Sequence, residues 1–191
     1  MTEKPSESEW PPYAIPSKDI LVALGVVSVK FNVLEMMLLV LFGVVTAIPE
    51  SIRSTIFSRL NQEARIELLQ VALKARKWPE PVSNRIDQFI AAFNACAASR
   101  HVLMHSAQAE GDEPHLFKFS KKGSLQSAKP TLADIRQTAD DMNAWTMFAA
   151  HLLGALMRNG QEDGSFAERI PWPDIPTQPQ NLSHKFLSAQ A

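Results

Sequence analysis

Arginine and histidine gather in one short run of this 191-residue sequence, where Arg100, His101 and His105 stand close together. A guanidinium is a permanent cation whose paired N–H groups match the oxygens of a phosphate. An imidazole exchanges a proton near neutral pH and can act as a general acid or base. Side chains of these types, held together, could bind a phosphate and move protons beside it. The alternative is that they are solvated cations at the end of a helix, where positive charge is favourable.

The two histidines also fit a metal-binding pattern. His101 and His105 stand at i and i+4, so a helix places them on one face, as in HxxxH zinc sites. Val102 occupies the position at which a metalloprotease carries its general-base Glu. Further ligands could come from Asp112, Glu113 and His115, but their spacing fixes no geometry. We therefore expect no metal site and no cofactor.

Most other catalytic and redox sites are excluded by motif. The sequence contains no P-loop, no dinucleotide-binding glycine motif and no GxSxG nucleophile motif. Cys96 is the only cysteine, so the chain can form neither an internal disulfide nor a CxxC redox pair. Its position three residues after Phe93 predicts a buried packing residue. This cysteine usage is typical of a reducing compartment, and we expect a cytoplasmic protein.

The charge balance limits the partners of the chain. Lys and Arg number 19 and Asp and Glu number 20, which gives a formal net charge of −1 and a pI of about 6.5. Proteins that coat nucleic acid or anionic membranes need a strong basic excess. The composition therefore excludes such a role but leaves room for a small basic site.

The elements that must position these side chains are helical. Apolar residues recur at spacings of three and four through most of the chain, and only seven glycines occur. Trp78 and Pro79 mark a break between helices, and Thr131 with Asp134 resembles a capping box. The predicted helices cover residues 17–47, 50–60, 61–77, 82–105 and 131–160.

These helices predict an all-α fold, an antiparallel bundle of four to five helices over residues 17–160. Residues 106–130 form a long insert before the last helix, and 116–126 could form a small β-hairpin within it. Prolines cluster at both ends of the chain. Because proline removes a backbone donor and fixes φ, we expect 1–16 to be a disordered or extended tail and 161–191 to be a proline-rich tail.

The most apolar segment, 20–48, is a candidate membrane span. Lys30 and Glu35 interrupt it, and its longest uncharged run covers only Met36 to Ile48. A transmembrane helix needs about 20 predominantly apolar residues. We therefore predict a buried helix and no membrane association.

A polar stripe breaks the apolar pattern of this first long helix. Ser28, Asn32 and Glu35 stand at i, i+4 and i+7, so they share one face. If the helix is central, this face needs a polar neighbour, and Glu35 is a natural counter-charge for Arg100. Alternatively, the stripe is the solvent face of a half-buried helix.

The run Arg100–His105 resembles the signature of the HEPN superfamily (higher eukaryotes and prokaryotes nucleotide-binding), an Arg followed by a polar residue and a His after four to six intervening positions. As in that family, the motif ends the penultimate long helix and precedes a connecting segment and a final long helix. Leu34 and Glu35 resemble the Leu-Glu pair on the first helix of several members. His101 departs from the pattern, because the family most often has Asn there.

The resemblance implies a metal-independent endoribonuclease, a toxin or defence effector, with Arg100 and His105 catalytic and with His101, Glu35 and Asn32 supporting. In a straight helix the two catalytic side chains point about 140° apart, so one chain is not expected to bring both to one phosphate. Family members dimerise so that two motifs face one cleft, and we expect a homodimer that acts on RNA and has an antitoxin or regulatory partner. The alternative is a non-catalytic helical dimer that binds a nucleotide or, through its proline-rich tail, a protein.

Overall fold

Five α-helices make up most of the computed structural model, which describes residues 16–76, 78–108, 115–119, 124–160 and 170–188. The predicted all-α bundle is confirmed. The predicted tail over residues 1–16 lies almost wholly outside the described residues. The helices are α1 (Lys18–Thr46), α2 (Glu50–Arg59), α3 (Gln62–Ala75), α4 (Glu80–His105) and α5 (Leu132–Asn159).

Local capping explains where the helices begin and end. α5 starts at the predicted capping box, in which Thr131 and Asp134 bond each other's backbone N–H groups. α3 starts at Asn61, whose side chain accepts from the N–H of Ala64 at 2.8 Å. α4 begins at Glu80, two residues before its predicted start, because a proline in the first turn costs the helix no hydrogen bond.

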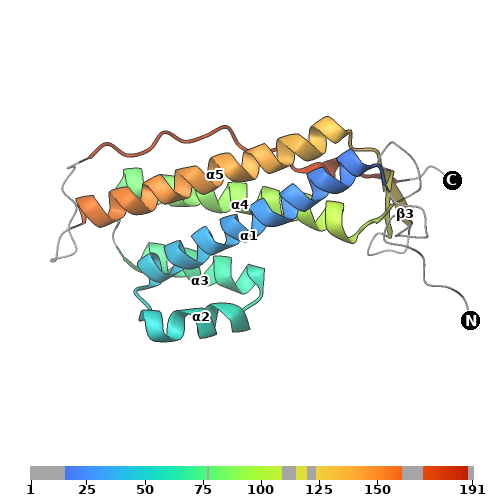
Figure 1. Ribbon diagram of the computed structural model, residues 1–191. Helices are drawn as coiled ribbons and strands as arrows, with labels where there is room; N and C mark the ends of the chain where they lie inside the picture. Colours follow the sequence, from blue (N-terminus) through green and yellow to red (C-terminus); the bar gives the residue numbers. More distant parts are fainter. Residues whose placement is uncertain (1–15, 77, 109–114, 120–123, 161–169, 189–191) are drawn as a thin grey trace, which may run out of the picture.

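Three long helices form the body of the bundle. α1 and α5 lie side by side and run in the same direction, and α4 runs the opposite way behind them (Figure 1). α1 and α5 are parallel because α4, which lies between them in the sequence, carries the chain back to the end of the bundle where α1 begins. α2 and α3 pack against the C-terminal half of α1, where the ring centroids of Phe42 and Phe57 are 5.6 Å apart.

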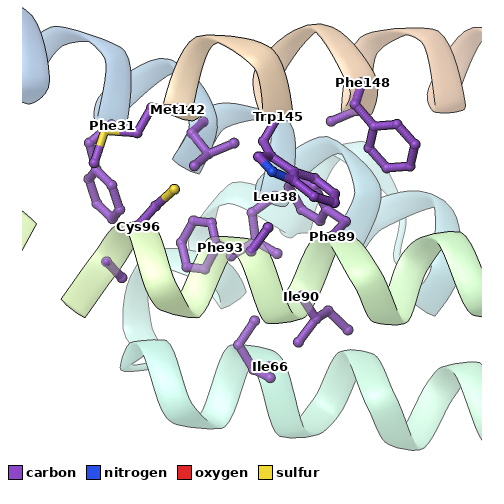
Figure 2. Close-up of a cluster of buried hydrophobic side chains, with 14 of the residues drawn as sticks. Phe31, Leu38, Ile66, Phe89, Ile90, Phe93, Cys96, Met142, Trp145 and Phe148 are labelled. Carbon is purple, nitrogen blue, oxygen red and sulfur yellow. The ribbon is translucent and has the colours of Figure 1, made fainter. Parts of the chain in front are cut away.

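The core fills the space between these helices (Figure 2). Met142 and Trp145 of α5 project toward α4, where Phe93 lies 5.6 Å, between ring centroids, from Phe31 of α1. Ile66 of α3 approaches α4 from its other side. Burying these large apolar side chains supplies the main driving force for packing the helices.

α1 is buried on one face only. Val27, Leu34 and Leu38 face the core and are fully buried, whereas Val22 and Val29 are exposed. The prediction of a buried helix is therefore right for half of its circumference. Among the described helices, α1 alone is long and apolar enough to cross a membrane by length and composition.

A small antiparallel sheet stands at the end of the bundle where α4 stops. The predicted hairpin is present as β2 (Leu116–Phe119) and β3 (Leu125–Ala128), with Leu116 opposite Ala128. β1 (Ala107–Gln108) and β4 (Leu187–Ser188) extend it, in the order β1-β2-β3-β4. β4 comes from the far end of the sequence and was not predicted.

The C-terminal segment 170–188, called here the C-terminal strap, is extended as its prolines predict, and it packs along the bundle (Figure 1). Side chains of the bundle hold its backbone: Arg85 donates to the carbonyl of Pro173 at 3.0 Å and the indole of Trp145 to that of Thr177 at 3.1 Å. The short helix Leu182–Lys185 then buries Leu182. The strap is thus an integral part of the fold, although the proline content indicated a tail beyond it.

Candidate functional site

The last turns of α4 carry the three side chains that the sequence singled out. Arg100 is half-buried, and His101 and His105 are exposed. The helix ends at His105, where Ser106 adopts an extended conformation and its N–H still bonds the carbonyl of Val102 at 3.2 Å. The side chains therefore stand on a regular helix that the core holds firmly through Val102 and Leu103.

Arg100 and His105 are in direct contact. Nη1 of Arg100 donates to Nε2 of His105 across 3.3 Å. A guanidinium has no acceptor atom, so this contact places the imidazole proton on Nδ1 and leaves Nε2 unprotonated. The angle of about 140° between the two positions on a straight helix therefore does not keep their side chains apart. The arginine side chain is long, and helical side chains lean toward the N-terminus, so His105 reaches back toward it.

His101 completes the cluster. Its ring centroid lies 4.9 Å from that of His105, with the planes tilted by 45°. The two imidazoles are neighbours because they stand one turn apart. A second titratable ring therefore lies beside the Arg100–His105 pair, on the exposed side of the helix.

The guanidinium of Arg100 is not neutralised by a carboxylate among the described residues. Its Cζ atom lies 5.6 Å from the ring centroid of Phe31. Its Nε atom is buried and has no hydrogen-bond partner among the residues that the structure describes. An unpaired buried donor is costly, and an uncompensated guanidinium attracts anions. The site is thus a positively charged spot on an otherwise near-neutral protein.

Glu35 does not serve Arg100, which corrects the interpretation of it as the counter-charge. Its Oε1 accepts from Nη1 of Arg65 at 2.6 Å. Arg65 is itself fixed, because its Nε donates to the carbonyl of Phe57 at 2.8 Å and its guanidinium lies 4.0 Å from the centroid of that ring. α3 packs against α1 at this level and brings its own cation to the carboxylate.

Asn32 also lies apart from the Arg100–His105 pair. It is exposed on α1 and lines a shallow hollow of about 290 Å³ that Glu35 and Arg65 border. Within the described residues, neither Asn32 nor Glu35 makes a hydrogen bond or ion pair with Arg100 or His105. The exposure of Asn32 fits the alternative interpretation, in which the polar stripe faces solvent.

Two residues near the site were missed by sequence reasoning. Phe31 lies beneath the guanidinium, and nothing distinguishes it from other core aromatics in the sequence. Ser99, fully buried beside Arg100, anchors the C-terminal strap: its Oγ donates to the carbonyl of Gln180 at 3.1 Å and accepts from the N–H of Leu182 at 3.0 Å. A polar residue on the core face of the helix was the available signal for Ser99.

The remaining chemistry-bearing groups support no other site. In the parts of the chain that the structure describes, no group of three or more His, Cys, Asp or Glu side chains could hold a metal ion. Burial, with a smaller effect of Asp141, raises the pKa of the Cys96 thiol to about 12. A thiol with so high a pKa is not a nucleophile at neutral pH, so the prediction of a packing residue is confirmed.

Comparisons with known proteins assign no activity to this chain. In comparisons with known proteins, no family model, no curated sequence and no solved structure matches it. The cluster Arg100–His101–His105 and its surroundings are therefore the features of this molecule that point to a function.

Proposed function

We propose that this protein is a metal-independent endoribonuclease of the HEPN type, acting as a homodimer. The observation that carries the proposal is the 3.3 Å contact between Nη1 of Arg100 and Nε2 of His105 on the exposed end of a rigid helix. It joins a cation without a described carboxylate partner to an imidazole whose unprotonated Nε2 could accept a proton once the guanidinium turns to a phosphate.

Arg100 would bind the phosphate. The C-terminal end of a helix carries partial negative charge, which repels an anion. A guanidinium supplies paired donors and a full positive charge, and these outweigh the repulsion. It would also stabilise the additional charge that develops on the phosphorane as the reaction proceeds.

The imidazoles would move the protons. The ribose 2′-oxygen forms a bond to the adjacent phosphorus, and the bond from phosphorus to the departing 5′-oxygen breaks. When the guanidinium of Arg100 turns from His105 to the phosphate, Nε2 of a neutral His105 is free to accept the proton of the 2′-hydroxyl, and a protonated imidazole gives one to the 5′-oxygen. The products are a 2′,3′-cyclic phosphate and a free 5′-hydroxyl, and no metal, oxidant or water is consumed.

Two imidazoles in opposite protonation states are needed at one phosphate, and this requirement supports the homodimer. His105 of each copy would supply one of them, with His101 as a supporting group beside each. The dimer would then present two Arg100–His105 motifs, one from each copy, to one RNA backbone.

The test is cleavage by His105→Ala. Purified wild type should cleave labelled RNA in the presence of EDTA and yield cyclic phosphate ends. His105→Ala should keep its circular dichroism spectrum and melting temperature while cleavage falls at least about a hundredfold, the usual weight of a general acid–base group. His151→Ala is the matched control, because His151 is exposed on the other long helix, α5, and should cleave like wild type.

Two outcomes would overturn the proposal. Undiminished cleavage by His105→Ala would remove the imidazole from the mechanism. RNA or nucleotide binding by wild type without cleavage would establish the non-catalytic binding module instead. A toxin role adds a cellular readout: expression of wild type should arrest bacterial growth, His105→Ala should not, and an antitoxin or regulatory protein should restore growth.

A further inference from the structure

A hollow of about 610 Å³ lies between the second half of α5 and the beginning of the C-terminal strap, and it is called here the strap pocket. Ala150, Gly154 and Arg158 line it from α5. Trp172 and Asp174 line it from the strap. Pockets that bind small molecules typically measure roughly 300–1,000 Å³ and combine an apolar lining with a few polar groups. The strap pocket has both properties.

The strap side of the pocket is fixed by the fold itself. Asn159 bonds both the N–H and the carbonyl of Ile170, each at 3.0 Å, and Nε of Arg85 donates to the carbonyl of Pro173 at 3.0 Å. Trp172 lies between these two anchors and packs part of its surface against the hydrophobic core. Prolines on both sides of Trp172 restrict the backbone further. Because this wall is already in place, a ligand would lose little affinity to ordering it.

Gly154 forms the floor of the strap pocket. It stands in the interior of α5, where glycine weakens a helix relative to alanine. A Cβ atom added there would meet nothing within 4 Å among the described residues, so their packing does not require a glycine at this position. Ala150, one helical turn earlier, is also small. A flat ring could therefore lie against this side of α5, with the indole of Trp172 as its other wall.

Charges of opposite sign stand toward the two ends of the pocket. The strap runs antiparallel to α5, because its beginning bonds Asn159 and its later part bonds Trp145. Arg158 therefore lies level with the beginning of the strap, and the backbone of Asp174 lies about 10 Å further along α5. Both side chains are exposed, and neither forms an ion pair with the residues that the structure describes. Each is thus available to a ligand that spans the pocket.

We propose that the strap pocket binds a small aromatic carboxylate that carries a hydroxyl or amino group at its other end. The guanidinium of Arg158 would hold the carboxylate through paired N–H donors. The ring would lie between Gly154 and Trp172, and the carboxylate of Asp174, which only accepts hydrogen bonds, would select the hydroxyl or amino group. The inference goes beyond the proposed nuclease and does not rest on it, because the pocket and the Arg100–His105 pair lie at opposite ends of the bundle (Figure 1).

The size and lining of the pocket favour a small ligand over a protein or a simple anion. A protein interface covers roughly 800 Å² per partner. The strap pocket spans only residues 150–158 of α5 and 170–174 of the strap. A free phosphate would use the guanidinium of Arg158 but would leave the indole of Trp172 and the apolar floor without contact.

The first test is titration calorimetry with 4-hydroxycinnamate, whose carboxylate and hydroxyl lie at opposite ends of a flat ring system. Wild type should bind it with a Kd on the order of 10⁻⁴ M, as expected for a ligand of this size. The methyl ester lacks the negative charge and cinnamate lacks the hydroxyl, so each should bind at least about tenfold more weakly. Amide NMR shifts caused by the ligand should centre on residues 150–158 and 170–174.

The second test removes the features of the pocket one at a time. Gly154→Leu would place a side chain in the hollow and should abolish binding while the helical spectrum is kept, because a Cβ atom meets nothing within 4 Å there. Gly25→Leu, at an exposed glycine of α1 with the same open surroundings, is the matched control. Arg158→Gln should weaken binding at least about tenfold, and Arg136→Gln, elsewhere on exposed α5 surface, should not. Asp174→Ala should remove the preference for 4-hydroxycinnamate over cinnamate.

Specific outcomes overturn the inference. No heat of binding and no amide shifts with millimolar 4-hydroxycinnamate would exclude such a ligand. Undiminished binding by Gly154→Leu would place the ligand outside the strap pocket. Equal affinity of wild type for the acid and its methyl ester would remove the role of Arg158, and equal affinity for cinnamate and 4-hydroxycinnamate would remove that of Asp174.

Discussion

Oε1 of Glu35 accepts from Nη1 of Arg65 at 2.6 Å and joins α1 to α3 through a partly buried ion pair. The sequence suggested Glu35 as the counter-charge of Arg100, whereas the structure pairs Glu35 with Arg65. Glu35 belongs to the packing of α3, and Arg100 keeps its charge for another partner. The first prediction tests this division.

Glu35→Gln should lower stability and leave cleavage unchanged. Glu35 is 39% exposed and Arg65 15%, so solvent weakens the pair. We expect a loss of about 1 kcal/mol in the free energy of unfolding, or roughly 2–4 °C in Tm. Thermal melts and RNA cleavage per folded molecule measure the two effects. Glu63→Gln, at an exposed position of the same helix as Arg65, is the control for the lost charge.

Arg100→Lys should fold normally and lose most of its cleavage. Lysine retains the positive charge but lacks the paired planar donors that hold a phosphate and contact Nε2 of His105. Removing such a donor typically costs about 10²–10³ in rate, and we expect a loss of that order. Single-turnover cleavage measures it, with Arg136→Lys on exposed α5 surface as the control. Full activity of Arg100→Lys would show that charge alone suffices.

Ser99→Ala should loosen the C-terminal strap. The substitution removes the hydroxyl that bonds both the carbonyl of Gln180 and the N–H of buried Leu182. Leaving these groups unpaired should cost about 1–3 kcal/mol. Hydrogen exchange should accelerate across residues 180–186 more than in the helices. Ser58→Ala, at an exposed serine that bonds only the Thr55 carbonyl, should leave exchange in the strap unchanged.

The pair of Asp134 and Lys185 should make strap attachment pH-dependent. The hydrogen bond from Lys185, with smaller contributions from Thr131, lowers the pKa of Asp134 below its ordinary value of 3.8. A lowered pKa means that the stabilisation is complete above the unfolded-state value and is lost as pH falls through the folded-state value. The stability difference between wild type and Lys185→Ala should therefore be largest at neutral pH, at most about 1 kcal/mol, and should shrink below about pH 4. Urea titrations at several pH values measure it, and a constant difference would contradict it.

Gly25→Ala should raise the stability of the folded chain. An added methyl group meets nothing within 4 Å among the described residues, so the free energy of unfolding should rise by about 0.5–1 kcal/mol. Gly154→Ala on α5, where a Cβ atom also meets nothing within 4 Å of the described residues, should give a similar gain, and thermal melts measure both.

The sequence by itself determined the helices and the cluster at the end of α4. Caps such as Thr131 with Asp134 and the break at Trp78 and Pro79 act within a few residues, so helix ends could be placed closely. Arg100 and His105 were identified for the same reason, since both lie in one run of a single helix. Local spacing did not predict their direct contact, which depends on side-chain length and direction.

Only the tertiary structure decided which partners distant residues take. Arg65 is 30 positions from Glu35, and Ser99 is 83 from Leu182, so no local pattern relates them. The same holds for α1, whose nearly continuous apolar sequence does not say which face the bundle covers. Packing against α4 and α5 buries Val27 and Leu34 and leaves Val22 and Val29 exposed, because a helix can turn only one face to its own core.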